Sequence, residues 1–129
     1  MSQKINILIV DDELIILDSI RKLLKNEDYE IFTVSSVNEG LEAIKKTDIN
    51  IVLTDLMMPE IDGLEFMQMI KKDNPKIPVI MITGFATINT ALQATQLGAF
   101  DYIAKPFSKK ELLGEIGRAS CRERVSSPV

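Results

Sequence analysis

The chain has 129 residues, of which 46% are hydrophobic and 26% are charged, and its formal net charge is -4 at pH 7. This length accommodates one domain with a short tail, and the acidic balance argues against general binding to nucleic acid or to anionic lipid. Histidine is absent and cysteine occurs once, at Cys121, which excludes histidine-based acid–base chemistry, most zinc sites and an internal disulfide. A single cysteine is also typical of a reducing compartment, and we therefore expect the protein in the cytoplasm.

The N-terminal half of the chain contains two strand–helix units. Ile5–Val10 is a near-continuous apolar run, which is typical of a strand that is covered on both faces. Glu13–Asn26 carries apolar residues at spacings of three and four, which predicts a helix with one apolar face. The pattern repeats with a strand at Glu30–Val34 and a helix at Val37–Lys46, for which one of the two preceding serines is the candidate N-cap.

The C-terminal half contains three further units. Their strands and helices are predicted at Ile51–Thr54 and Leu64–Lys72, at Pro78–Thr83 and Thr87–Leu97, and at Asp101–Ala104 with a last helix from Lys109 onward. Residues 77–100 lack charges, but this stretch contains a proline, a glycine and several polar residues, so no membrane span is predicted. Five strand–helix units with short connections predict a doubly wound α/β fold, in which helices cover both faces of a five-stranded parallel sheet.

Acidic residues follow two of the predicted strands. Asp11, Asp12 and Glu13 come directly after the first strand, and Asp55 comes directly after the third. Since the carboxyl ends of parallel strands share one edge of the sheet, these residues are expected to lie close together. Each also has a structural alternative, because Asp11 or Asp12 can cap a helix and Asp55 can anchor a turn. As a group, carboxylates that repel one another favour a hard divalent cation, Mg²⁺ or Mn²⁺.

Thr83 ends the predicted fourth strand, and Lys105 directly follows the predicted fifth strand, so both are expected at the same edge of the sheet. Taken alone, each is more often an ordinary strand end or a solvated lysine. Beside a metal ion, however, a lysine supplies positive charge for a phosphoryl oxygen and a threonine supplies a hydroxyl donor. A carboxylate in these surroundings is equipped to attack phosphorus, so Asp55 is the candidate nucleophile, with an aspartyl phosphate as its product.

Four segments carry a resemblance to a known family: ILIVDDE, IVLTDLMMPEIDGLEF, VIMITGFA and GAFDYIAKPF. In this order and spacing they resemble the receiver domain of bacterial two-component response regulators. The resemblance implies a flavodoxin-like (βα)5 topology with strand order 2-1-3-4-5. We predict a receiver domain at 1–117 and a tail at 118–129, which is either a truncated linker or sequence foreign to the natural gene.

The resemblance also implies a role for each matched residue. Asp55 is the phosphoacceptor, Thr83 and Lys105 contact the phosphoryl group, and Lys105–Pro106 is a cis peptide. Tyr102 is the switch aromatic that turns inward when Thr83 is drawn to the phosphate, although a half-buried edge aromatic is the plain structural alternative. The implied metal ligands are Asp11 (through water), Asp12, Asp55 and the backbone carbonyl of Met57.

The implied function is phosphorelay signal transduction. A sensor histidine kinase or a phosphotransfer protein supplies the phosphoryl group, and the domain itself is no turnover enzyme, since it only phosphorylates and dephosphorylates itself. Phosphorylation switches the surface formed by the fourth helix, fifth strand and fifth helix, through which two copies pair and an output such as transcription is controlled. A stand-alone or hybrid-protein receiver that acts by docking is the alternative. Neither direct nucleic-acid binding nor membrane association is expected.

Two positions bear on the lifetime of the phosphorylated state. Met57 and Phe85 are bulky and apolar, and we expect them to hinder the water that hydrolyses the aspartyl phosphate. Met57 also argues against a haloacid-dehalogenase-type phosphatase, which needs a second aspartate at this place. A flavodoxin-like cofactor site is disfavoured as well, because the acidic residues after the first strand repel phosphate unless a cation intervenes.

Overall fold

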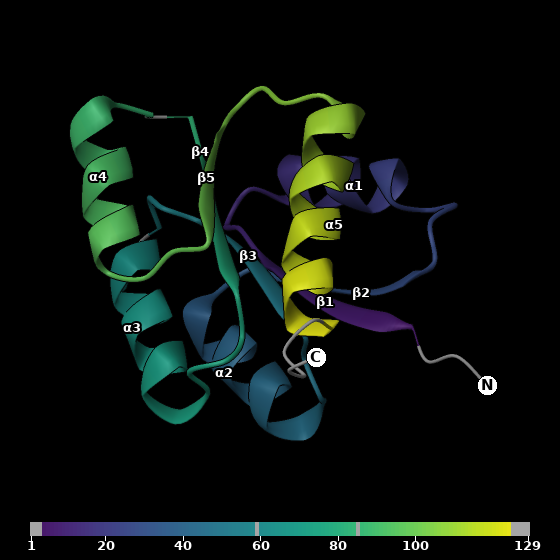
Figure 1. Ribbon diagram of the computed structural model, residues 1–129, viewed down its shortest axis with the longest axis horizontal. Coiled ribbons are helices and arrows are strands. Elements are labelled where there is room, and N and C mark those ends of the chain that lie inside the picture. The colour runs from purple at the N-terminus through teal and green to yellow at the C-terminus, as the bar shows by residue number, and fades with distance from the viewer. Residues whose placement is uncertain (1–3, 59, 85, 125–129) are drawn as a thin grey trace.

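The computed structural model describes residues 4–58, 60–84 and 86–124, in which strands and helices alternate strictly (Figure 1). The strands are β1 (Ile5–Val10), β2 (Tyr29–Val34), β3 (Ile51–Asp55), β4 (Val79–Thr83) and β5 (Asp101–Ala104). The helices are α1 (Leu14–Leu23), α2 (Val37–Lys46), α3 (Gly63–Asp73), α4 (Ile88–Gln96) and α5 (Lys109–Arg124).

All neighbouring strands pair in parallel, in the order β2-β1-β3-β4-β5. The predicted doubly wound five-stranded fold is therefore confirmed, and so is its strand order. Every residue of β3 and β4 is buried, because these central strands are covered by helices on both faces. This explains why their sequences are apolar without alternation.

Two hydrophobic clusters lie on opposite faces of the sheet. On one face, Ile7 and Ile9 of β1 pack with buried residues of α1 and α5. On the other face, Leu8 and Val10 pack with α2, α3 and α4. Successive side chains of a strand point to opposite faces, so one apolar run supplies both clusters. Figure 1 shows the two groups of helices on either side of the sheet.

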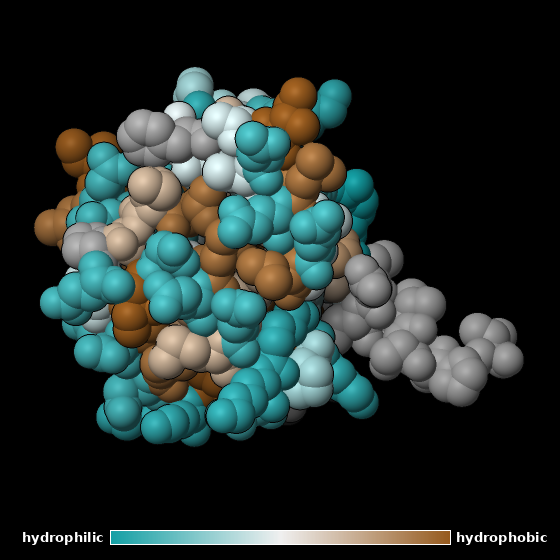
Figure 2. Space-filling view, turned by 90° about the vertical axis from the view of Figure 1, so that its left-hand side faces the viewer, coloured by the Kyte–Doolittle hydropathy of each residue, from teal (hydrophilic) through white to brown (hydrophobic). Residues whose placement is uncertain are grey.

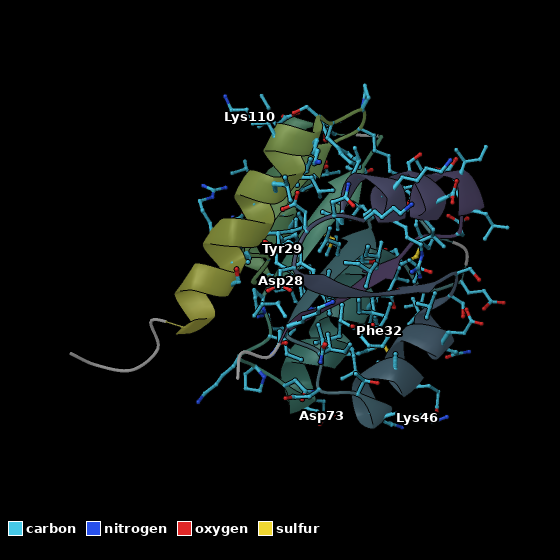
Figure 3. The ribbon with its side chains drawn as sticks, turned by 90° about the vertical axis from the view of Figure 1, so that its right-hand side faces the viewer. Asp28, Tyr29, Phe32, Lys46, Asp73 and Lys110 are labelled. Carbon is cyan, nitrogen blue, oxygen red and sulfur yellow. The ribbon has the colours of Figure 1, made fainter. Side chains whose placement is uncertain are left out.

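The outermost strand β2 is only half-buried along its length. Figure 3 views the molecule with this strand toward the reader. Tyr29 packs against the cluster beneath α1 and α5, whereas Phe32 packs against the cluster on the other face. Their odd spacing places the two rings on opposite faces of the sheet.

Helix ends agree with the local sequence signals. Ser36 is the N-cap of α2, and its hydroxyl accepts a hydrogen bond from the Glu39 backbone N–H at 3.2 Å. Gly98 follows α4 with a φ of 110°, the left-handed conformation that favours glycine. The first helix is shorter than predicted and ends at Leu23, yet Leu24 stays buried in the turn that follows, which accounts for the longer apolar period.

The last helix runs past the predicted domain end at residue 117 and reaches Arg124. Ala119 is fully buried against the core, so this part of the predicted tail packs with the domain. Residues 125–129 lie outside the described residues, and the boundary of the natural domain stays a prediction. Among the described residues, no helix combines the length and the apolar character needed to cross a bilayer.

Candidate functional site

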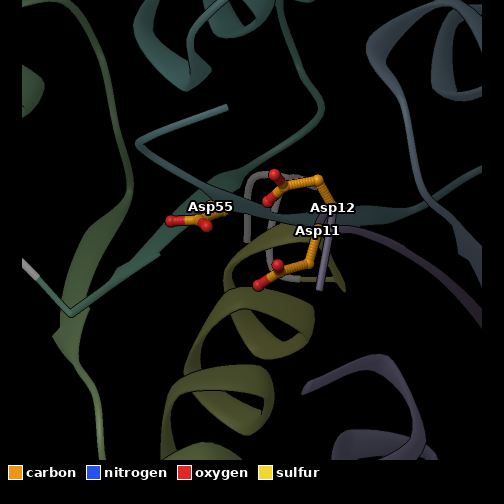
Figure 4. Close-up of side chains that lie close together, drawn as sticks. All are labelled: Asp11, Asp12 and Asp55. Atoms are coloured by element: carbon orange, nitrogen blue, oxygen red, sulfur yellow. The ribbon is translucent and has the colours of Figure 1, made fainter. Parts of the chain in front are cut away.

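The register of the central strands brings three aspartates together. Val10 of β1 pairs with Thr54 of β3, so Asp11, which directly follows β1, and Asp55, which ends β3, lie at the same edge of the sheet. Asp12 follows at the start of the loop to α1. One carboxylate oxygen from each aspartate lies within 4.8 Å of the others (Figure 4). The sequence prediction that these residues converge is met in the structure.

Backbone amides orient the two buried carboxylates. Asp11 and Asp55 are 2% and 5% exposed, whereas Asp12 is exposed. Asp11 Oδ1 accepts a hydrogen bond from the Glu13 backbone N–H at 2.8 Å, and Asp55 Oδ1 accepts one from the Met57 backbone N–H at 3.3 Å. The turn-forming roles considered as alternatives are therefore present together with the acidic cluster.

Lys105 joins the cluster from the loop after β5. Its Nζ donates to Asp11 Oδ2 at 3.0 Å, to Glu13 Oε1 at 3.3 Å and to Asp55 Oδ2 at 3.4 Å. The lysine is held in place by its own backbone N–H, which donates to the Thr83 carbonyl at 2.8 Å. The predicted cis peptide between Lys105 and Pro106 is present.

The site holds more negative charge than its lysine balances. Burial raises the pKa of Asp11, and this effect outweighs the hydrogen bonds from the Glu13 amide and from Lys105. Burial and repulsion by Asp11 raise the pKa of Asp55 despite the nearby ammonium. Burial opposes the charge on Lys105, but its hydrogen bond and ion pairs with Asp11 and Asp55 raise the pKa of the ammonium. Such an oxygen-lined, electron-rich site is suited to a hard cation.

A solvent-connected cavity of about 290 Å³ opens onto this cluster. Its lining consists of Asp12, Glu13, Asp55, Met57, Gly84 and Lys105. The volume suffices for a phosphoryl group with its coordinating waters. The side chain of Met57 is 53% exposed at the rim of the cavity, while the ligand role predicted for its carbonyl stays a prediction.

Two residues without a predicted role take part in the site. Glu13 is a third carboxylate for Lys105, and its position directly after the paired aspartates was the available signal. Gly63, the first residue of α3, packs directly against the backbone of Asp55: a Cβ there would lie 2.2 Å from the Asp55 carbonyl oxygen. Only the contact itself reveals this need for glycine, because the Asp62-Gly63 pair reads in sequence as an ordinary turn.

Neither of the two predicted switch residues belongs to the lining of this cavity. Thr83 is fully buried at the end of β4, next to Gly84, which lines the cavity. Tyr102 lies opposite Met81 in the sheet, and its hydroxyl is hydrogen-bonded to Thr90 of α4. Phe85 lies outside the described residues.

Comparison with known proteins identifies the family. The family model for the response regulator receiver domain matches residues 7–117. The chain is 41% identical over 116 residues to the regulatory protein VanR of Enterococcus faecium, covering 90% of this chain and 49% of VanR. It spans half or less of this and the other leading curated relatives, which are longer proteins.

Solved structures agree with this assignment. A receiver domain protein from Clostridium thermocellum is 35% identical and superposes with a TM-score of 0.90, covering 95% of this chain and 99% of that one. The beryllofluoride-activated NtrC4 receiver domain dimer is 34% identical, with a TM-score of 0.87 and coverage of 92% and 98%. With its parallel fold, its acidic cluster and this match over nearly its whole length, the chain belongs to the response regulator receiver domain family.

Proposed function

We propose that the chain receives a phosphoryl group on Asp55 from a histidine kinase or phosphotransfer protein. The observation that carries the proposal is the convergence of Asp11, Asp12 and Asp55 with the Lys105 ammonium at one cavity. In this reaction a bond forms between an Asp55 oxygen and phosphorus, while the bond from phosphorus to the donor nitrogen breaks. The donor supplies the histidine, so the absence of histidine from this chain is consistent with the proposal.

The carboxylates fit a resident Mg²⁺ or Mn²⁺. Asp12 and Asp55 would bind the ion directly, Asp11 would hold it through water, and the Met57 carbonyl would complete the protein ligands. When bound, the ion neutralises charge on the transferring phosphoryl group. The raised pKa values of Asp11 and Asp55 support the fit, because a divalent cation relieves the repulsion that burial amplifies.

The remaining residues position and sense the phosphoryl group. Lys105 already lies 3.4 Å from Asp55, from where its ammonium stabilises negative charge on a phosphoryl oxygen. Thr83 then supplies a hydroxyl to another oxygen, and Tyr102 responds to its movement. The domain turns over no external substrate; it only gains and loses its own phosphoryl group.

The signalling surface is assigned to α4, β5 and α5. The sequence of α4 contains no charged residue, and Ile88 and Leu92 are 81% and 55% exposed. Figure 2, which views the molecule from the side of α3 and α4, shows apolar side chains exposed among hydrophilic ones on this side. The NtrC4 receiver forms a dimer, and we assign pairing of two copies to this face of the present chain.

The proposal also covers the whole protein. ZraR of Klebsiella oxytoca is named a transcriptional regulatory protein and ycf27 of Porphyridium aerugineum a probable transcriptional regulator, and their additional length leaves room for an output module. Control of transcription from the cytoplasm is the function that this supports best. A stand-alone or hybrid-protein receiver that acts by docking is the second reading, and the gene's reading frame beyond the receiver distinguishes the two.

Mass spectrometry with acetyl phosphate as donor tests the central step. The wild-type protein is expected to gain one phosphoryl group in Mg²⁺ and none in excess EDTA. Asp55→Asn is expected to lose the label, whereas Asp18→Asn, on the exposed face of α1, keeps it. Stoichiometric, Mg²⁺-dependent labelling of Asp55→Asn would refute Asp55 as the acceptor.

A further inference from the structure

The Thr90 hydroxyl lies at a junction between α4 and β5. Thr90 Oγ1 receives the Thr87 backbone N–H at 3.1 Å and donates to the Thr87 carbonyl at 3.1 Å. In return, Thr87 Oγ1 accepts the Thr90 backbone N–H at 3.0 Å, which completes a reciprocal cap of the helix. The Tyr102 hydroxyl reaches the same Thr90 oxygen at 2.5 Å.

The Thr90 hydroxyl is shared by the helix cap and by Tyr102. A threonine hydroxyl has one proton and two acceptor lone pairs. Thr90 Oγ1 also lies 3.0 Å from Thr87 Oγ1, and either hydroxyl can donate in this contact and in the contact with Tyr102. The cap of α4 and the position of Tyr102 therefore share one oxygen atom.

We infer that Thr90 is a positioning residue that fastens Tyr102 to the first turn of α4, and so couples the Tyr102 rotamer to the end of the signalling helix. The inference deepens the proposed function, on which it rests. When Tyr102 leaves Thr90, the Thr90 hydroxyl loses its phenol partner. Ile88 lies in the same turn, two residues before Thr90, and is 81% exposed. A shift of this turn therefore moves an apolar side chain that is exposed on the molecular surface.

The expected size of the coupling follows from the loss of one hydrogen bond. A hydrogen bond between neutral groups changes the equilibrium constant between two states by about fivefold. Removing the Thr90 hydroxyl is therefore expected to shift the balance between the Thr90-bound rotamer of Tyr102 and its alternatives by about this factor. The change makes the unphosphorylated protein resemble the phosphorylated one more closely.

Tyrosine fluorescence measures this directly. The sequence contains two tyrosines and no tryptophan, so Tyr29→Phe leaves Tyr102 as the sole fluorophore among these residue types. In this background we would compare Thr90→Val, Thr90→Ser and Thr95→Val. The Thr95 hydroxyl lies on the same helix and donates to the Ala91 carbonyl at 2.9 Å, so Thr95→Val is a matched control that leaves the Tyr102–Thr90 contact in place. Thr87→Val removes the capping hydroxyl, which also lies 3.0 Å from Thr90 Oγ1, but it keeps the Thr90 hydroxyl that Tyr102 contacts.

Thr90→Val is expected to move the emission of unphosphorylated Tyr102 toward that of the acetyl-phosphate-treated parent. Thr90→Ser should retain the parent emission, and neither Thr95→Val nor Thr87→Val should reproduce the shift. Identical emission of Thr90→Val and Thr95→Val overturns the inference, and so does an equal shift in Thr87→Val, which would trace the effect to the cap alone. Failure of the proposed function has a different signature: the parent then gains no phosphoryl group by mass spectrometry, whatever the emission of the variants.

Discussion

Replacement of Asp55 by asparagine is expected to stabilise the metal-free protein while it abolishes phosphorylation. Asp55 is 5% exposed and clusters with two other aspartates, Asp11 and Asp12. Asparagine has nearly the same shape and keeps an oxygen that can accept the Met57 N–H. The substitution thus removes the charge with little change in packing.

The magnitude follows from the distances in the site. With an effective dielectric constant of about 20, a carboxylate at the upper limit of 4.8 Å from Asp55 repels it by about 3.5 kcal/mol. The ammonium of Lys105 at 3.4 Å attracts it by about 5 kcal/mol on the same scale. Two repulsions exceed one attraction, but solvent screens the exposed Asp12, so the net gain is about 1–2 kcal/mol. Lys105 keeps Asp11 and Glu13 as partners in the variant.

Urea and thermal unfolding monitored by circular dichroism in EDTA provide the assay. At pH 7 the Asp55→Asn variant should gain about 1–2 kcal/mol in the free energy of unfolding, which raises Tm by about 3–10 °C for a chain of this size. The control, Asp18→Asn, should stay within about 0.5 kcal/mol of the wild type, because its ion pair is solvent-exposed. In millimolar Mg²⁺ the wild type should gain more stability than the variant, because ligand binding stabilises the folded state.

The pH dependence checks the cause. Because the pKa of Asp55 in the folded protein is raised above its ordinary 3.8, the folded state binds more protons than the unfolded state between these two values. The contribution of Asp55 to the free energy of unfolding of the wild type therefore falls as pH rises from 3.8 through the raised pKa. Over the same interval the free energy of unfolding of Asp55→Asn increases relative to that of the wild type. A variant less stable than the wild type in EDTA at pH 7, or an advantage that is independent of pH, would refute the reasoning.

Three further substitutions test other parts of the site. Lys105→Ala should bind Mg²⁺ at least as tightly as the wild type by calorimetry, because the lysine ammonium competes with the ion for Asp11 and Asp55. Its phosphorylation by acetyl phosphate should be at least about tenfold slower than that of the wild type. An undiminished rate would contradict a role of Lys105 at the phosphoryl group. Gly63→Ala should lower the free energy of unfolding by more than about 2 kcal/mol, because its Cβ would lie 2.2 Å from the Asp55 carbonyl oxygen. The control Gly114→Ala, with open space around the new Cβ, should be neutral or stabilising by up to about 1 kcal/mol. Equal effects of the two substitutions would show that the close approach of Gly63 to Asp55 is unimportant. Met57→Asn should shorten the lifetime of the aspartyl phosphate in a chase with EDTA, because a polar side chain at the cavity rim admits and orients water, and a lifetime equal to that of the wild type would leave Met57 without this role.

Local patterns were sufficient for the architecture. The alternation of apolar strand runs with helical periods predicts the five units, and the structure has them within three residues at every boundary that the sequence assigned. Signals such as Ser36 and Gly98 work because capping and left-handed turns depend on neighbouring residues only. The convergence of Asp11, Asp12 and Asp55 was predictable for a related reason, since parallel strands bring their carboxyl ends to one edge.

Tertiary structure decided the contacts that convert this edge into a site. Lys105 meets Asp11 across 94 positions of sequence, and Tyr102 meets Thr90 across the space between a strand and a helix. Gly63 proves necessary only when α3 begins directly against the Asp55 carbonyl. Each of these contacts depends on the exact strand register and on how the helices pack against the sheet. The order of residues along the chain determines only at which edge of the sheet a side chain is placed. Sequence alone therefore determined which groups reach the edge, and packing determined which of them touch.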